Sequence, residues 1–164
     1  MAKRVITMKL SASSIRDAIT ELKSFRDSLE AKTKVFLEEL ANIGFKEASI
    51  RFTTAMYDGV NDSHVTLKPI EGGFCIVAEG NAVAFIEFGA GATYGYGHPQ
   101  AGEFGVGPGT YPDGKGHWDN PKGWWFGSGQ HTYGNPPAAA MWSAVQEIAE
   151  NVTEIAKEVF RSTV

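Results

Sequence analysis

The stretch from Ala82 to Ile148 decides the fold of this chain. It opens with the apolar run FIEFGAG at Phe85–Gly91 and closes with NPPAAAM at Asn135–Met141. The apolar run predicts a strand over Ala82–Phe88 that its glycines end. Proline is tolerated in the first helical turn, so the second motif predicts a helix that starts at about Pro136. Between them lies a loop of about residues 89–135.

The composition of this loop is unusual. It holds 14 of the 19 glycines, nine of the 19 aromatic residues and three of the four histidines. A connector of this length is typically functional or disordered. Two interpretations remain open. The aromatic residues either pin the loop onto its own domain or a neighbouring subunit, or they form a platform that stacks on sugar rings or bases, centred on Trp118, Trp124 and Trp125.

The remaining composition sets the class. The 164 residues suit one domain, 1–164. The net charge of -4 provides no basic surface for tight nucleic-acid binding. Cys75 is the single cysteine and lies in an apolar run, so we expect it to be buried and the compartment to be reducing. No secretory signal pattern and no long apolar segment occurs, so we expect neither standard secretion nor contact with a membrane.

Upstream of the decisive stretch, the pattern is mostly helical. Val5–Leu10 predicts an edge strand, and the Ser14–Asp17 spacing resembles a capping box. Apolar residues then recur at helical intervals, at Ile15, Ile19, Leu22, Phe25, Leu29, Phe36, Leu40 and Ile43. The run Thr33–Val35 favours two helices with a bend between them, and Gly44 looks like a helix stop. For Phe45–Met56 we favour further helix over strand.

The centre of the chain predicts a β-meander. Its strands would be His64–Lys68, Gly73–Ala78 and Ala82–Phe88, joined by short turns. After the loop, apolar residues step by 4, 3, 4, 3, 4 from Met141 to Val159. We expect this seam to pack on the sheet, although a seam between subunits would have the same pattern. The predicted class is α+β: N-terminal helices and a long C-terminal helix packed on a small antiparallel β-meander.

No constellation of catalytic residues stands out. His98, His117 and His131 share the loop with acidic residues, but their spacing matches no metal-ligand signature. Glu87 would suit a hydrolase acid paired with Glu79 or Glu103, yet an outward-facing strand carboxylate is commoner. No serine has a convincing nucleophile elbow. We therefore expect a non-enzymatic display or assembly domain without a cofactor or metal.

The order of several motifs resembles the tail-component family of long-tailed bacteriophages and prophages, named for gene product ten of a lambdoid coliphage. The motifs are FIEFGAG at 85–91, HPQAGEFG at 98–105, GWWF at 123–126, HTYGNPPA at 131–138 and the closing amphipathic helix. The resemblance extends upstream to 37–44 and 57–62, and so covers most of the chain. It departs at Ala139–Ala140, where family members often carry a larger or aromatic residue.

The resemblance implies a structural virion protein for tail completion or head-to-tail joining, sometimes labelled a minor capsid protein. Such a protein is made in the host bacterial cytoplasm. It forms a homo-oligomeric ring of sixfold symmetry in the neck, against a stopper, tail terminator or tail tube. Genomic DNA would pass through without specific binding, which mild acidity favours. The loop would then be an assembly arm, with interface residues Tyr94, Tyr96, His98, Phe104, Trp118, Trp124, Trp125, Phe126 and Tyr133.

Overall fold

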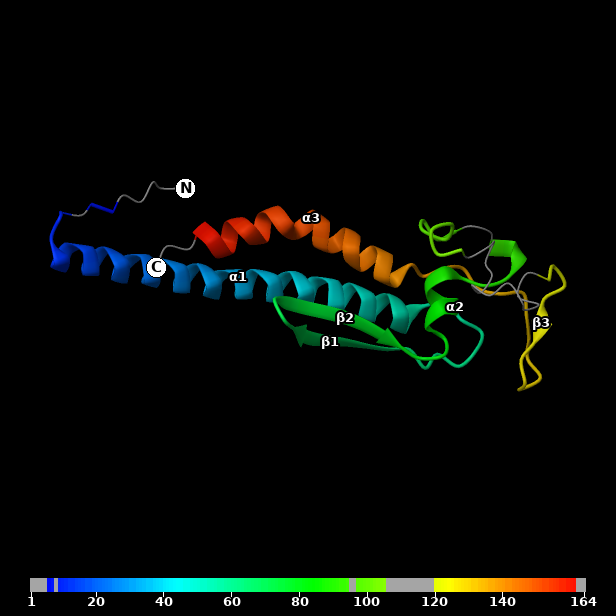
Figure 1. The fold of residues 1–164 in the computed structure, drawn as a ribbon. Coiled ribbons are helices and arrows are strands. Elements are labelled where there is room, and N and C mark those ends of the chain that lie inside the picture. The colour runs from blue at the N-terminus through cyan, green and yellow to red at the C-terminus, as the bar shows by residue number, and fades with distance from the viewer. Residues whose placement is uncertain (1–5, 8, 95–96, 106–119, 162–164) are drawn as a thin grey trace.

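The computed structural model describes residues 6–7, 9–94, 97–105 and 120–161. Over these described residues the elements are three α-helices, one 3-10 helix and four strands. In chain order they are α1 (Ala12–Thr54), β1 (His64–Ile70), β2 (Gly73–Glu79), α2 (Val83–Phe88), η1 (Ala92–Tyr94), β3 (Trp124–Trp125), β4 (His131–Thr132) and α3 (Ala140–Arg161). The strands form two antiparallel pairs, β1–β2 and β3–β4. Figure 1 shows an elongated molecule in which α1 lies between α3 and the β1–β2 pair. The α+β class is confirmed.

The prediction of two N-terminal helices is wrong, because α1 is one helix of 43 residues. Thr33 is accommodated inside it, since its hydroxyl donates to the Leu29 carbonyl oxygen at 2.9 Å. The helix begins at the N-cap Ser11, whose side chain accepts from the Ser14 backbone N–H. It does not begin with the predicted capping box at Ser14.

Gly44 does not end the helix. A Cβ at this position would lie 2.8 Å from Cδ1 of Ile76 on β2, and it would also crowd Ile148 on α3. The glycine therefore lets α1 approach the sheet on one side and α3 on the other. Helix continues to Thr54, as predicted for most of the segment after Gly44.

The seam of α3 packs on α1 rather than on the sheet. Leu40 of α1 forms a buried cluster with Ile155 and Val159. The rings of Phe36 and Phe160 lie 5.7 Å apart at the end of the same contact. The intramolecular packing of this seam was predicted, but its partner was not.

The third meander strand is not formed. Val83–Phe88 is the short helix α2, and the turn before it is held by Asp62, whose carboxylate accepts from the backbone N–H groups of Asn81 and Ala82. These hydrogen bonds, the Asn81 bond first, hold the pKa of Asp62 below its ordinary value. The C-terminal carbonyls of α2 are satisfied by a segment some fifty residues later. Ala138 and Ala139 donate to the carbonyl oxygens of Ile86 and Glu87 at 2.8 and 3.1 Å.

Three further predictions are corrected. Cys75 is exposed. It lies opposite Lys68 in the β1–β2 pair, and both side chains point to the face of the pair that is turned away from α1. No strand forms among the described residues of Val5–Leu10. Pro136 and Pro137 precede α3, which starts at Ala140.

The resemblance leads to the expectation of a larger residue at Ala139–Ala140, and Ala140 lies in a closely packed region. Ala140 has no exposed surface and joins the buried cluster of Phe52, Ala82 and Ile86. A larger residue here would overpack that cluster. The small side chain of Ala140 therefore allows the start of α3 to pack closely against α2 and the end of α1.

Candidate functional site

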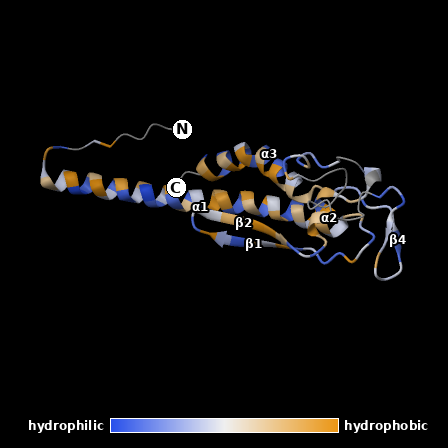
Figure 2. Cartoon of the chain, turned by 45° about the vertical axis from the view of Figure 1, so that its right-hand side comes forward, coloured by the Kyte–Doolittle hydropathy of each residue, from blue (hydrophilic) through white to orange (hydrophobic). Residues whose placement is uncertain are grey.

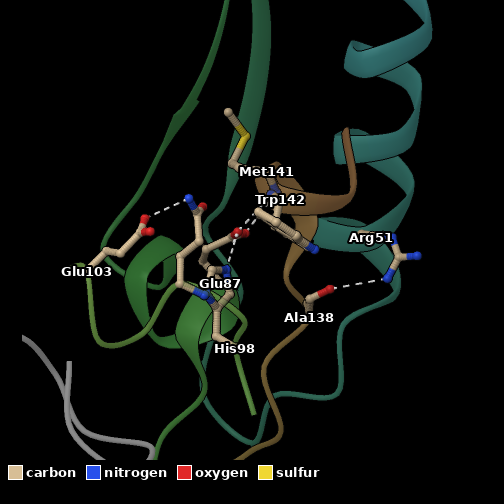
Figure 3. Close-up of polar contacts among 8 residues, drawn as sticks. Arg51, Glu87, His98, Glu103, Ala138, Met141 and Trp142 are labelled. Atoms are coloured by element: carbon tan, nitrogen blue, oxygen red, sulfur yellow. Dashed lines mark hydrogen bonds and ion pairs between the residues drawn. The ribbon is translucent and has the colours of Figure 1, made fainter. Parts of the chain in front are cut away.

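The start of α3 is capped by a buried carboxylate from α2. Glu87 is 6% exposed. Its Oε2 accepts from the Met141 backbone N–H at 2.9 Å, and its Oε1 accepts from the Trp142 backbone N–H at 3.2 Å (Figure 3). A helix N-terminus carries unpaired N–H groups and positive potential, so it stabilises a carboxylate in this position. The expectation that Glu87 faces outward from a strand is wrong.

His98 completes the environment of Glu87. Its Nε2 lies 3.1 Å from Glu87 Oε1, and its Nδ1 accepts the Gln100 backbone N–H at 3.1 Å. The imidazole is therefore assigned as the neutral tautomer with the proton on Nε2, which donates to Glu87. The ring of His98 also packs 4.5 Å from that of Phe88. The first part of the loop is thereby fastened to α2.

This pair has little capacity for acid-base catalysis. Both oxygens of Glu87 are occupied by donors that belong to the fold. Neither of the proposed dyad partners shares its site: Glu79 pairs with Lys68 at 3.5 Å, and Glu103 accepts from Gln100 at 2.9 Å. These hydrogen bonds hold α2, the start of α3 and the first part of the loop together, which is a structural role.

The end of the loop is fastened by a second set of contacts. Ala90 and Asn135 form an isolated antiparallel bridge with two N–H···O bonds of 2.9 Å. The side-chain amide of Asn135 donates to the Phe85 carbonyl oxygen at 2.8 Å. The hydroxyl of Thr132, which is 2% exposed, donates to Asp58 Oδ2 at 2.7 Å. Both ends of the loop are thus held by buried or half-buried polar contacts.

The β3–β4 pair lies at the end of the molecule opposite the N-terminal part of α1 (Figure 1), and two aromatic side chains on or beside it are exposed. Trp125 and Tyr133 are 69% and 59% exposed. His131 lies between them, with ring centroids 4.7 Å from Trp125 and 4.8 Å from Tyr133, both edge-on. His131 is held in place by the Lys122 carbonyl oxygen, 3.0 Å from its Nε2. We call these three side chains the aromatic row.

A cavity of about 220 Å³ opens beside the aromatic row. Aromatic side chains dominate its wall, and Asp58, Thr132 and Asn135 add polar groups. The aromatic side chains are Tyr57, Phe85, Trp124, Trp125 and Phe126. An apolar wall with a few polar groups is typical of a small binding site, and the cavity is small for a drug-sized ligand.

The predicted interface residues fall into separate groups. Trp125 and Tyr133 belong to the aromatic row, whereas Trp124, 7% exposed, is part of the core. His98 is buried against Glu87, and Phe104 is exposed but packs 5.3 Å from Phe88. The other members differ in kind: Tyr94 is exposed, Phe126 is half-buried, and Tyr96 and Trp118 lie outside the described residues.

The sequence interpretation missed the polar contacts that hold the loop. The sequence offered Glu87 as a hydrolase acid or as an outward-facing carboxylate but not as a helix cap, and it did not single out Asp58, Thr132 or Asn135. The sequence holds one local indication of these contacts: each of the polar residues is adjacent in the chain to a glycine, a proline or an aromatic residue. The partners lie 11 to 74 residues apart, which no local pattern reveals.

In the described part of the chain, no group of three or more histidine, cysteine or acidic residues is placed to hold a metal ion. His117, Asp113 and Asp119 lie outside it. Within the same residues, no helix has the length and apolar character needed to cross a membrane.

Comparisons with family models, with curated proteins and with solved structures gave no significant match.

Proposed function

We propose that this chain is a structural, non-enzymatic virion protein of a tailed phage that acts in tail completion or head-to-tail joining. It would assemble into a homo-oligomeric ring, sixfold as the family resemblance implies, at the neck of the virion. Its neighbours would be a stopper, tail terminator or tail tube protein. Made in the host cytoplasm, it would let genomic DNA pass without specific binding.

The aromatic row is the observation that carries this proposal. Trp125, His131 and Tyr133 are ordered by ring contacts on a hairpin that polar contacts fasten to the body. Exposed aromatic side chains held in place before binding lose little conformational entropy on association, and they often dominate interface energy. In a ring, such a row meets a different surface of the next subunit, because ring interfaces are heterologous.

The charge supports the same proposal. A net charge of -4 gives the chain no excess of positive charge that would hold phosphates, so it would favour the passage of DNA through the proposed ring. The described elements also offer little else for chemistry, since both oxygens of the one buried carboxylate have structural partners.

Immunogold electron microscopy of particles of the phage that encodes this chain tests the proposal. Gold at the junction of head and tail is the expected result. Absence from purified particles, or gold confined to fibres or the distal tail tip, would overturn it.

A carbohydrate- or cell-wall-binding module is the second candidate. The cavity beside Trp125 favours it, because an exposed indole next to polar groups can stack on a sugar ring while Asp58 accepts its hydroxyl groups. Intrinsic tryptophan fluorescence titrated with host wall polysaccharide separates the two. A saturable shift that Trp125→Ala abolishes favours the module, whereas a flat titration favours the assembly protein.

A further inference from the structure

Aromatic side chains make up much of the wall of the cavity beside the aromatic row. Five of them line it: Tyr57, Phe85, Trp124, Trp125 and Phe126. In Figure 2 the orange of aliphatic residues is concentrated on the helices and is sparse around β4, which supplies Thr132 to this wall. The faces of aromatic rings carry negative potential and attract cations, most strongly when the cation leaves water. The wall therefore has the composition of an aromatic cage.

Asp58 is the charged residue of this wall. No lysine, arginine or histidine is found among the described residues that line the cavity. Asp58 also belongs to none of the ion pairs in the part of the chain that the structure describes. Its carboxylate therefore has no counter-charge there. Beside an apolar wall, such a carboxylate attracts a cation more strongly than it would in open water.

A hydrogen bond holds the carboxylate of Asp58 in place. Thr132, which is buried, donates its hydroxyl hydrogen to Asp58 Oδ2 at 2.7 Å. The same hydroxyl oxygen accepts the Gly134 backbone N–H at 3.0 Å, which helps to orient the hydroxyl toward Asp58. Asp58 Oδ1 has no hydrogen-bond donor within the described residues. One carboxylate oxygen is thus fixed by the fold, and the other is left for a ligand.

The polar groups of the wall favour a cation that has no N–H group. The amide hydrogens of Asn135 go to the carbonyl oxygens of Phe85 and Pro136, at 2.8 and 3.3 Å. The hydroxyl hydrogen of Thr132 goes to Asp58. These side chains have no hydrogen left for the hydroxyl oxygens of a sugar. A lysine ammonium has three N–H donors, whose hydrogen bonds an aromatic wall replaces only in part. A trimethylammonium group has no N–H, so a carboxylate and aromatic rings suffice for it.

We propose that this cavity binds a trimethylammonium group, with Asp58 as its counter-ion and the aromatic side chains as its cage. The cavity volume of about 220 Å³ suits a head group of this kind better than a drug-sized ligand. Thr132 is a positioning residue, because it acts through Asp58. The site lies within one folded chain, so the inference goes beyond the proposed function and does not depend on a ring. It also assigns the cavity a ligand class that differs from the sugar of the second candidate.

Titration calorimetry of the full-length chain with choline chloride, at constant ionic strength, tests the proposal. Choline should bind with a dissociation constant of about 1 mM or lower. Neohexyl alcohol has the shape of choline but carries carbon in place of the charged nitrogen, and it should bind at least about 10-fold more weakly. Glucose should not bind. Choline binding that does not saturate by about 20 mM, or equal affinity for the uncharged alcohol, would overturn the proposal.

Two variants test the residues. Asp58→Asn keeps an acceptor for the Thr132 hydroxyl and removes the charge, so it should weaken choline binding at least about 10-fold. Glu154→Gln is the matched control, because it removes the same charge in the second half of α3, outside the cavity wall, and should leave binding within about 2-fold. Circular dichroism should show both variants folded. Equal choline affinity of Asp58→Asn and the native chain would overturn the assignment of the counter-ion.

A vesicle assay separates two sources of the same chemical group. Phosphatidylcholine vesicles carry it on a lipid, whereas choline carries it in solution. Choline binding without cosedimentation with the vesicles supports the site and assigns a soluble ligand. Cosedimentation that free choline displaces and that Asp58→Asn abolishes supports the site and assigns a lipid head group. Cosedimentation that neither free choline nor Asp58→Asn changes, in a chain that gives no heat with choline, would overturn the proposal.

Discussion

The carboxylate of Glu87, at the end of α2, lies 3.1 Å from the imidazole of His98 in the loop, and the same carboxylate caps α3. One buried residue thus joins three segments that are distant in the sequence. The loop that carries the aromatic row is therefore part of the folded body where it leaves α2, and a change at Glu87 should affect the start of α3 as well.

Replacing Glu87 by glutamine should lower the free energy of unfolding by about 1–3 kcal/mol. Glutamine has one acceptor oxygen, while three donors converge on the two oxygens of the glutamate. Urea denaturation followed by circular dichroism measures the loss. Glu79→Gln is the matched control: its ion pair with Lys68 is exposed, so it should change stability by less than about 1 kcal/mol. Equal effects of the two variants would contradict the capping role.

The two adjacent tryptophans should separate stability from assembly. Trp124→Ala should cost about 3–5 kcal/mol, because its side chain is buried. Trp125→Ala should change stability by less than about 0.5 kcal/mol and still impair assembly, because its side chain is exposed. Thermal unfolding and incorporation of the variant into particles measure the two effects. Normal incorporation of Trp125→Ala would exclude the aromatic row as an interface.

Gly134 should not tolerate a side chain. Its φ is 102°, and a Cβ would collide with the carbonyl oxygen of Ala90 in the bridge that ties the loop to α2. Gly134→Ala should lower the free energy of unfolding by at least about 2 kcal/mol. Gly127→Ala is the control, because a Cβ there meets no atom within 4 Å. A mild effect at both glycines would show that the bridge contributes little.

Asp62 should make stability depend on acid pH. Its pKa is lower in the folded chain than the ordinary value of 3.8, because the backbone N–H groups of Asn81 and Ala82 stabilise the charged form. The contribution is therefore complete above about pH 5 and is lost as the pH falls through the lowered folded pKa. Unfolding midpoints measured from pH 7 to pH 2.5 should fall more steeply below pH 4 for the native chain than for Asp62→Asn. Parallel curves would contradict this assignment.

The sequence predicted the elements that periodicity controls. The long α3 seam, the β1–β2 pair and most of α1 follow from spacing alone. The errors have tertiary causes: Gly44 serves close packing between α1, β2 and α3, and α2 replaces a strand because Asp62 holds its start and residues 135–139 satisfy its end. Such partners are far apart in the chain, so local patterns carry no trace of them.

The sequence predicted that aromatic residues of the loop make up the candidate site, but it did not predict how they are arranged. Aromatic residues of the loop were grouped as one interface, but the structure separates Trp124, which is buried, from Trp125 and Tyr133, which are displayed. The alternation of side chains along a strand explains why Trp124 is buried and Trp125 is exposed, because neighbouring residues of a strand face opposite sides. No register for the β3–β4 pair follows from local sequence patterns, so the buried and exposed sides could not be assigned in advance.

Electron microscopy of a lysate from phage whose copy of this gene carries an early stop codon tests the central claim most directly. The account predicts filled heads separated from tails, or tails of aberrant length, with wild-type particles restored by the gene supplied in trans. Intact particles of normal appearance would contradict a role in joining head to tail.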